Sequence, residues 1–125
     1  MRKIAPQRAL RIGVTLGIAF ACSGCDVARS DSKTEARQGA ALISSLGCGY
    51  CHSIPGIDGA DANVGPPLDH IGSRVYVAGV LRNTPENLQS WVRHPQAVVP
   101  GNAMPDLPMS EASARKIVAY LETLR

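Results

Sequence analysis

The sequence has 125 residues, which leaves room for one domain and little more. Four of its 13 basic residues lie within the first 11 positions, so residues 25–125 carry nine basic and ten acidic side chains, a net charge of −1 (9 − 10). The formal charge of +3 therefore gives no indication of nucleic-acid binding.

Residues 1–24 have the layout of a bacterial export signal. Arg2, Lys3, Arg8 and Arg11 come first with no acid among them, an apolar run over residues 12–21 follows, and small residues come next. The apolar run has about ten residues, whereas a membrane-spanning helix needs roughly 20. A transmembrane anchor is therefore the weaker interpretation of this segment.

The leader ends in "CSGC", in which Ser23 and Gly24 precede Cys25. This resembles the lipobox of bacterial lipoproteins and implies that Cys25 is lipidated and begins the mature chain. The sequence departs from that pattern at Cys22, where lipoproteins usually have leucine. Ordinary cleavage nearby, which would release a soluble protein, is the alternative. On the lipoprotein interpretation, residues 25–33 are the lipidated cysteine with a polar tether, and residues 34–125 form the domain.

The first predicted helix begins at the capping box "SKTE", with Ser32 as N-cap, and runs to Leu46. Its apolar positions recur at helical spacing, and Gly39 leaves a notch in that face.

The second predicted helix has Thr84 as N-cap and Pro85 at its first position, and it ends before Pro95. His94 at that end is interpreted as a solvated or capping histidine. Ser110 caps a last helix, whose apolar stripe consists of Ala114, Ile117, Val118, Leu121 and Leu124.

Residues 53–73 and 96–109 are rich in Gly, Pro, Asp and Asn and are predicted to be loops, and no β-sheet is expected. Loops of this length inside a compact domain are usually functional. Only five aromatic residues occur in the whole chain. The sequence therefore predicts an all-α domain with a small core, which a bulky internal cofactor would complete.

The segment "CGYCH" matches the attachment motif of c-type haem, with Cys48, Cys51 and His52 as its reactive side chains. Thiols three residues apart reach the two vinyl groups on one edge of a porphyrin, and the next residue places its imidazole at the iron. A thiol–disulfide centre would have no need of the histidine.

A zinc site is the other alternative for a C-x-x-C pair, and it needs a second pair of ligands at suitable spacing. The remaining cysteines lie in the leader, and His70 and His94 are isolated. Haem attachment is therefore the favoured interpretation.

Six elements in order resemble class I cytochrome c over residues 34–124. They are an N-terminal helix, C-x-x-C-H, "GPPL" at 65–68, a helix, "PGNAM" at 100–104, and a C-terminal helix with "AYL" at 119–121. The resemblance implies the all-α cytochrome c fold, with three to four short helices and long loops around one covalently bound haem c.

The resemblance also implies roles for single residues. Met104 corresponds to the second axial ligand of the iron, although gap-filling is the simpler role of a loop methionine such as Met109. Pro66 corresponds to the proline whose carbonyl holds the axial histidine. Arg74 corresponds to a buried arginine near a haem propionate, and Trp91 to an aromatic residue beside the methionine.

Asn102 could donate a hydrogen bond to a propionate, although a turn residue is the simpler interpretation. A closer resemblance covers residues 78–106, which are similar to the cytochrome domain fused to subunit II of some bacterial haem-copper oxidases. It extends only to that electron-entry module, and not to a copper domain.

These resemblances imply a membrane-tethered one-electron carrier rather than an enzyme, because both axial positions of the iron would be taken. Its partners would be a terminal oxidase, a quinol–cytochrome c reductase or a dehydrogenase, with no nucleic acid. It would lie at the periplasmic face of the inner membrane, or in the soluble periplasm. Two alternatives stay open: a fixed haem c subunit of a dehydrogenase or oxidase, and a peroxide-reducing or gas-binding haem if Met104 dissociates easily.

Overall fold

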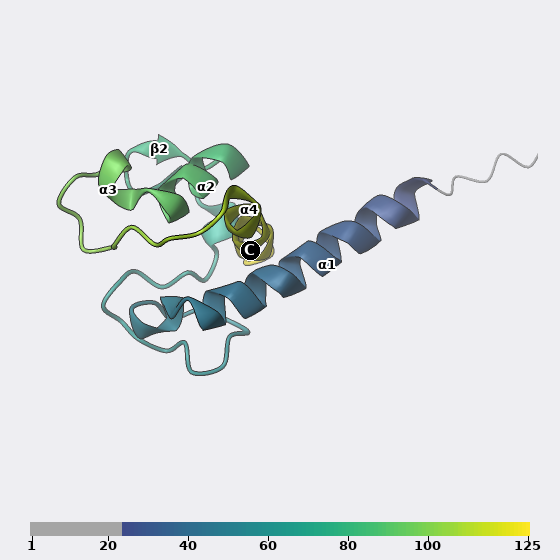
Figure 1. Ribbon diagram of the computed structural model, residues 1–125, viewed down its shortest axis with the longest axis horizontal. Helices are drawn as coiled ribbons and strands as arrows, with labels where there is room; N and C mark the ends of the chain where they lie inside the picture. Colours follow the sequence, from purple (N-terminus) through teal and green to yellow (C-terminus); the bar gives the residue numbers. More distant parts are fainter. Residues whose placement is uncertain (1–23) are drawn as a thin grey trace, which may run out of the picture.

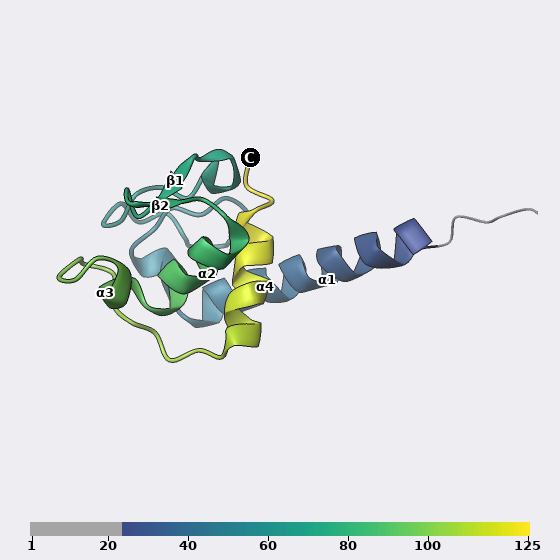
Figure 2. The same ribbon diagram turned by 90° about the horizontal axis from the view of Figure 1, so that it is seen from above.

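The computed structural model describes residues 24–125, and the predicted export signal and the side chain of Cys25 lie outside this description. Its helices are α1 (Gly24–Ser45), α2 (Pro85–Arg93), α3 (Pro95–Val98) and α4 (Glu111–Leu121), with 3-10 turns at Cys48–Tyr50 and Ile71–Ser73. Figures 1 and 2 show that α1 packs on the body with its C-terminal part and projects from it with its N-terminal part. The predicted all-α architecture with long loops is confirmed.

Helix α1 crosses α4, and Gly39 makes this crossing possible. Gly39 is buried, and a Cβ atom built on it would overlap the carbonyl oxygen of Lys116 in α4. The two backbones therefore approach more closely than any side chain at this position would allow. The notch predicted at Gly39 is the contact point of the two helices.

The core is small and aliphatic. Its fully or nearly buried side chains are Ile43, Ile54, Ala60, Ile71, Val77, Leu88, Val92, Ala114, Ile117, Val118 and Leu121, and no polar side chain of the described residues is buried. Half-buried Trp91, Met109 and Tyr120 pack against its rim. The predicted stripe of α4 supplies four of these residues, and Leu124 packs against them.

Two helix starts follow the capping rules. The Thr84 hydroxyl accepts from the backbone N–H of Asn87 at 3.2 Å, and the Ser110 hydroxyl accepts from Ser113 at 3.1 Å. Each cap satisfies a backbone donor that has no partner inside the helix. Helix α2 ends at Arg93, as Pro95 predicts, and exposed His94 is its C-cap.

The prediction of a helix start at Ser32 is wrong. Helix α1 begins at Gly24, so residues 25–33, expected as an irregular tether, are helical. After Gly24 these residues contain no proline or glycine to stop a helix.

The loop expected after α2 also differs from the prediction at its start, where residues 95–98 form the short helix α3. Proline suits the first position of a helix, so Pro95 both ends α2 and opens α3.

The expectation of no β-sheet is also wrong, because β1 (Tyr76–Val77) and β2 (Leu81–Arg82) pair antiparallel. Strands of two residues are too short to show an alternating pattern. Their turn contains Ala78 and Gly79, both with positive φ (55° and 72°). Alanine rarely adopts this conformation, so the sequence carries no usual hairpin signal.

Among the described residues, no helix combines the length and the apolar character needed to cross a bilayer.

Candidate cofactor-attachment site

The two cysteines of the C-x-x-C-H motif lie in the turn that follows α1. Gly47 precedes this turn with φ 74°, a conformation that glycine adopts without strain, and the N–H groups of Cys51 and His52 donate to the Cys48 carbonyl at 3.2 and 3.0 Å. Both thiols are unpaired and half-buried. One short turn therefore carries both thiols and the imidazole.

Gly49, the first residue between the cysteines, has no room for a side chain. A Cβ atom at this position would lie 2.8 Å from the Cβ of Ala60. The turn therefore packs directly on the loop that follows it.

Burial raises the pKa of the Cys48 thiol, and the neighbouring Cys51 adds to this effect, while a backbone hydrogen bond opposes it.

The imidazole of His52 is oriented by the chain itself. Its Nδ1 lies 2.7 Å from the carbonyl oxygen of Pro66, so Nδ1 carries the proton and donates it to that carbonyl. This leaves Nε2 as the nitrogen that can bind a metal. The predicted contact between Pro66 and the histidine ring is present.

Gly65 lies against the same ring, and a Cβ atom on it would overlap Cε1 of His52. The N–H groups of Gly65 and Leu68 donate to the carbonyls of Cys51 and Ser53 at 2.7 and 2.8 Å. The "GPPL" loop is thus fastened alongside the motif, which places the Pro66 carbonyl where the ring needs it.

Arg74 braces this loop rather than lying in the core. Its Nη2 donates to the carbonyls of Pro67 and Asp69 at 2.5 and 3.1 Å and lies 3.7 Å from the Asp69 carboxylate. Its side chain is 35% exposed, and its predicted place near a haem propionate stays a prediction. In this structure, Arg74 holds the residues next to Pro66.

Met104 is half-buried in a loop that is closed by hydrogen bonds. The Asn102 side-chain amide donates to the carbonyls of Pro95 and Val99 at 2.9 and 2.6 Å, and its oxygen accepts from the Met104 N–H at 2.7 Å. Asn102 therefore acts as a turn residue, and both of its amide hydrogens are used within the chain. Trp91 lies half-buried against the core.

Three further residues hold the loops of the site through contacts that the sequence did not indicate. Gln96 bonds the Met104 loop, Asn83 donates to the carbonyls of Ile71 and Arg74 at 2.7 and 3.0 Å, and the Tyr120 hydroxyl donates to the Pro55 carbonyl at 2.5 Å. Their partners are backbone carbonyls 8 to 65 residues away, and a carbonyl carries no sequence pattern that would mark it. The "AYL" motif contained Tyr120 without indicating its contact.

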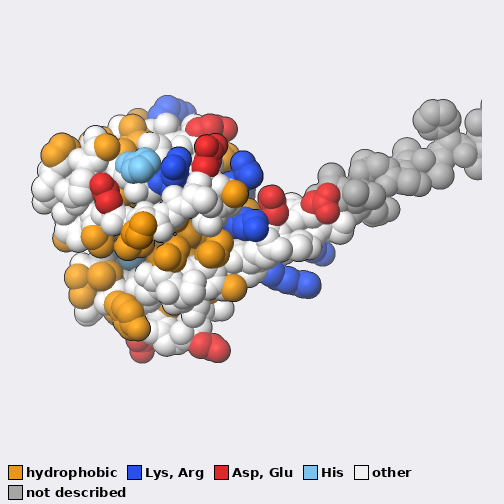
Figure 3. Space-filling view, viewed as in Figure 1, with side chains coloured by type: hydrophobic (Ala, Val, Ile, Leu, Met, Phe, Trp, Pro, Cys, Tyr) orange, Lys and Arg blue, Asp and Glu red, His pale blue; other side chains and the backbone are white. Residues whose placement is uncertain are grey.

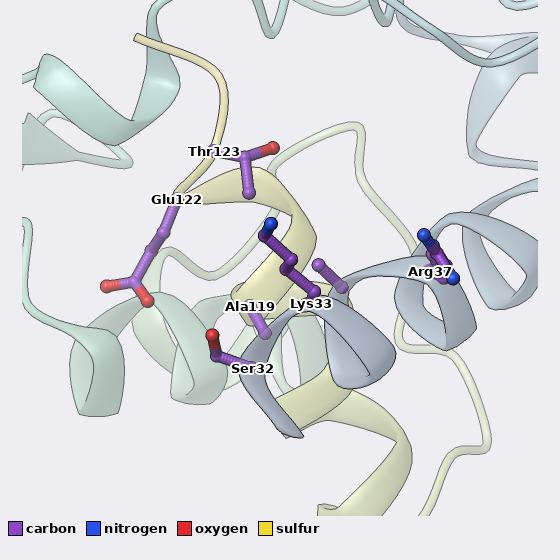
Figure 4. Close-up of a pocket in the computed structure, with 7 residues that line it drawn as sticks. Ser32, Lys33, Arg37, Ala119, Glu122 and Thr123 are labelled. Carbon is purple, nitrogen blue, oxygen red and sulfur yellow. The ribbon is translucent and has the colours of Figure 1, made fainter. Parts of the chain in front are cut away.

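Two surface depressions lie away from this site. One, between α1 and the end of α4, is lined by Ser32, Lys33, Ala36, Arg37, Ala119, Glu122 and Thr123. Figure 4 shows Arg37 and Glu122 on opposite sides of it. The other lies at α2 and contains Arg93, His94 and Glu111. Neither contains a residue of the C-x-x-C-H motif or the methionine loop.

The residues present fit a covalently attached haem. Two unpaired thiols share a turn with an imidazole whose Nδ1 is already engaged, and a thioether lies in a separate braced loop. No group of three or more His, Cys, Asp and Glu side chains in the described part could hold a bare metal ion. Fold and site together define a small helical protein of the c-type haem class.

Comparison with known proteins gives the family. The family model described as "Cytochrome c" matches residues 36–125. This chain belongs to the cytochrome c family and is an electron-transfer protein with covalently bound haem c.

Similar proteins include three described as "Cytochrome c oxidase subunit 2". The protein of Alkalihalophilus pseudofirmus is 38% identical over 95 residues, which are 75% of this chain and 27% of the relative. Those of Bacillus subtilis and Bacillus sp. PS3 are 34% and 32% identical, each over 72% of this chain and 26% of the relative. The chain thus spans about a quarter of their length, and the predicted resemblance to oxidase subunit II is confirmed.

Proposed function

We propose that this chain carries one haem c, bound by thioethers to Cys48 and Cys51, with His52 and Met104 as axial ligands. The observation that carries this proposal is the 2.7 Å contact between His52 Nδ1 and the Pro66 carbonyl, which supports a tautomer whose unprotonated Nε2 can bind iron. When bound, the haem supplies the ferrous–ferric couple. A thioether ligand favours the ferrous state and raises the potential relative to two nitrogen ligands.

The experiment is to produce the exported protein with a haem-attachment system and to compare the variants Met104→Ala and Met109→Ala. The wild-type protein keeps one haem per chain after denaturation. Met104→Ala opens the iron to carbon monoxide and lowers the potential, whereas Met109→Ala does neither. Haem that extracts into acidified organic solvent contradicts thioether attachment. A spectral change in Met109→Ala but not in Met104→Ala would show that Met109, and not Met104, is the ligand.

The proposed activity is electron transfer between respiratory complexes at the periplasmic face of the membrane. The relatives are subunits of an oxidase, which supports a terminal oxidase as partner, with a quinol–cytochrome c reductase or a dehydrogenase as other candidates. Two exposed apolar side chains near the proposed haem site support docking of a protein partner: Tyr50, within the motif, is 85% exposed, and Val64, beside the "GPPL" loop, is 74% exposed. Figure 3 shows such apolar surface across the body of the molecule.

A fixed haem c subunit of an oxidase or dehydrogenase is the second candidate, favoured by the same relatives. Mild detergent extraction distinguishes the two. A carrier elutes from a sizing column as a small protein, whereas a fixed subunit elutes with the activity of the complex.

Membrane attachment through lipid on Cys25 completes the proposal. Because the segment after Cys25 is helical, the eight residues 26–33 span about 12 Å at ~1.5 Å per residue, less than the about 25–30 Å of an extended chain. The haem domain would then lie close to the bilayer, on a stiff stalk. Cys25→Ser is expected to release the protein into the soluble fraction with its spectrum intact, and a wild-type protein that is already soluble contradicts the anchor.

A further inference from the structure

The Met104 loop is held by one side chain from outside it, that of Gln96 in α3. Its Nε2 donates to the carbonyls of Asn102 and Met104 at 2.9 and 2.7 Å, and its Oε1 accepts from the N–H of Gly101 at 3.1 Å. One carboxamide thus uses both its donors and its acceptor on three residues of the loop.

Gln96 is itself fixed by the far end of the same loop. Its backbone N–H donates to the Asp106 carboxylate at 3.1 Å. The Asn102 side chain connects the same two segments. Its oxygen accepts from the Met104 N–H, and its nitrogen donates to the carbonyls of Pro95 and Val99. Residues 95–106 therefore form a closed ring of hydrogen bonds, called here the carboxamide clamp of Gln96 and Asn102.

The clamp acts on Met104 in particular. Asn102 holds the backbone N–H of Met104, and Gln96 holds its carbonyl. The other methionine of the described residues, Met109, has neither its N–H nor its carbonyl in a hydrogen bond. All the bonds of the clamp lie within the polypeptide, so none of them depends on a bond between sulfur and iron.

We propose that Gln96 is a positioning residue for the axial methionine. Gln96 holds the Met104 carbonyl, and it also holds the carbonyl of Asn102, whose side chain holds the Met104 N–H. It thereby limits the motion that would carry the sulfur away from the iron, and so excludes other ligands from that position. The inference rests on the proposed ligation by Met104. This restraint on Met104 matters most in the ferric state, because thioether ligation favours ferrous iron and the bond from sulfur to ferric iron is the weaker one.

Gln96→Ala removes three hydrogen bonds at once. Gln96→Glu is the more specific test, because it keeps the shape of the side chain and removes only the donor. Glutamate has nearly the same shape and can still accept from Gly101, but at neutral pH it has no donor for the two carbonyls and presents an oxygen to them. We expect both variants to raise the affinity of the ferric protein for imidazole tenfold or more, which corresponds to about 1.4 kcal/mol per tenfold. We also expect a weaker charge-transfer band in the red, the band that reports the bond between ferric iron and the methionine sulfur.

The experiment titrates the ferric holoprotein with imidazole in the wild type, Gln96→Ala, Gln96→Glu, Met104→Ala and Gln38→Ala. Gln38 is an exposed residue of α1 and serves as the matched control, with wild-type affinity expected. Unchanged affinity in Met104→Ala overturns the proposed ligation. Raised affinity in Met104→Ala with wild-type affinity in both Gln96 variants overturns the clamp alone.

A measurement on the wild-type holoprotein keeps the inference testable if the Gln96 variants fail to accumulate. The N–H groups of Gly101 and Met104 are donors within the clamp, whereas that of Ala103 between them donates to no group of the described residues. Hydrogen exchange is expected to be slow at residues 101 and 104 and fast at Ala103. Equally fast exchange at all three overturns the clamp.

Discussion

At the scale of single residues, the site depends on backbone carbonyls held in place by side chains. The Pro66 carbonyl orients His52, Arg74 holds the carbonyls that follow Pro66, and Tyr120 holds the carbonyl of Pro55. A hydrogen bond contributes about 1 kcal/mol net, but its geometric effect on a ligand is larger than this energy indicates.

Gly65→Ala tests how closely the histidine ring is enclosed. Gly65 does not have a positive φ, so alanine meets no conformational barrier, but its Cβ overlaps the His52 ring. We expect a loss of about 1–3 kcal/mol in the free energy of unfolding, as in overpacked interiors, together with a changed ferric spectrum. Denaturant unfolding of the holoprotein measures the loss in the free energy of unfolding. The control is Asn63→Ala, at an exposed position in the same loop. A neutral Gly65→Ala would show that the ring is free to move.

Tyr120→Phe tests the connection between α4 and the loop after the motif. Losing the hydroxyl is expected to cost about 0.5–1.5 kcal/mol with the haem spectrum unchanged. Because burial raises the pKa of Tyr120, its contribution is present below the usual tyrosine pKa of about 10 and is lost as the pH rises through the folded-state pKa. Wild-type stability should fall there more steeply than that of Tyr120→Phe. Tyr50→Phe, at an 85% exposed position, should behave as wild type throughout.

At the scale of elements, the contact between α1 and α4 fixes where the motif begins. Ile43 at 1% exposure and Gly39 lie on the α1 face that meets α4, and the attachment turn starts directly after this helix. The position of Cys48 therefore depends on a helix crossing whose closest point lies nine residues earlier.

Gly39→Ala sets two effects against each other. In an exposed helix this change would stabilise by about 0.5–1 kcal/mol through propensity. Here the added Cβ overlaps a backbone oxygen, which cannot rotate away, so we expect a net loss of about 1–3 kcal/mol. Thermal unfolding of the holoprotein measures it, with exposed Ser44→Ala in α1 expected to be neutral or slightly stabilising. A rise in Tm for Gly39→Ala would mean that the two helices can separate at no cost.

At the scale of the whole molecule, the helix that closes the core also extends beyond it. Helix α1 has 22 residues, about 33 Å at ~1.5 Å per residue, and Figure 2 shows its N-terminal part standing clear of the body. Ser30 to Thr34 are exposed, while the buried residues of α1 begin at Gly39. Residues 30–34 thus add no buried side chain to the core, as the spacer proposed for residues 25–33 would require.

Removing residues 25–33 should consequently leave the haem domain intact. We expect the shortened protein, exported behind a cleavable signal, to keep its spectrum and its Tm within a few degrees, since surface changes away from the core are usually within about 0.5 kcal/mol. Calorimetry of the two holoproteins makes the comparison. A Tm lower by ten degrees or more would show that the spacer supports the fold.

The sequence by itself determined the attachment motif, the order of the three longer helices and the caps at Thr84 and Ser110. These are local patterns, in which a few neighbouring residues carry the chemistry or satisfy the helix end. It also indicated the notch at Gly39, because a glycine on an apolar helical face has few other uses.

Tertiary structure alone decided the remainder. The hairpin at residues 76–82 and the contacts of Gln96, Arg74 and Tyr120 were not predicted. The hairpin is too short for periodicity, and each of the three side chains bonds a backbone carbonyl that any residue could supply. Such a partner leaves no trace in sequence, since a carbonyl has the same chemistry at every position and only the folded path of the chain selects it.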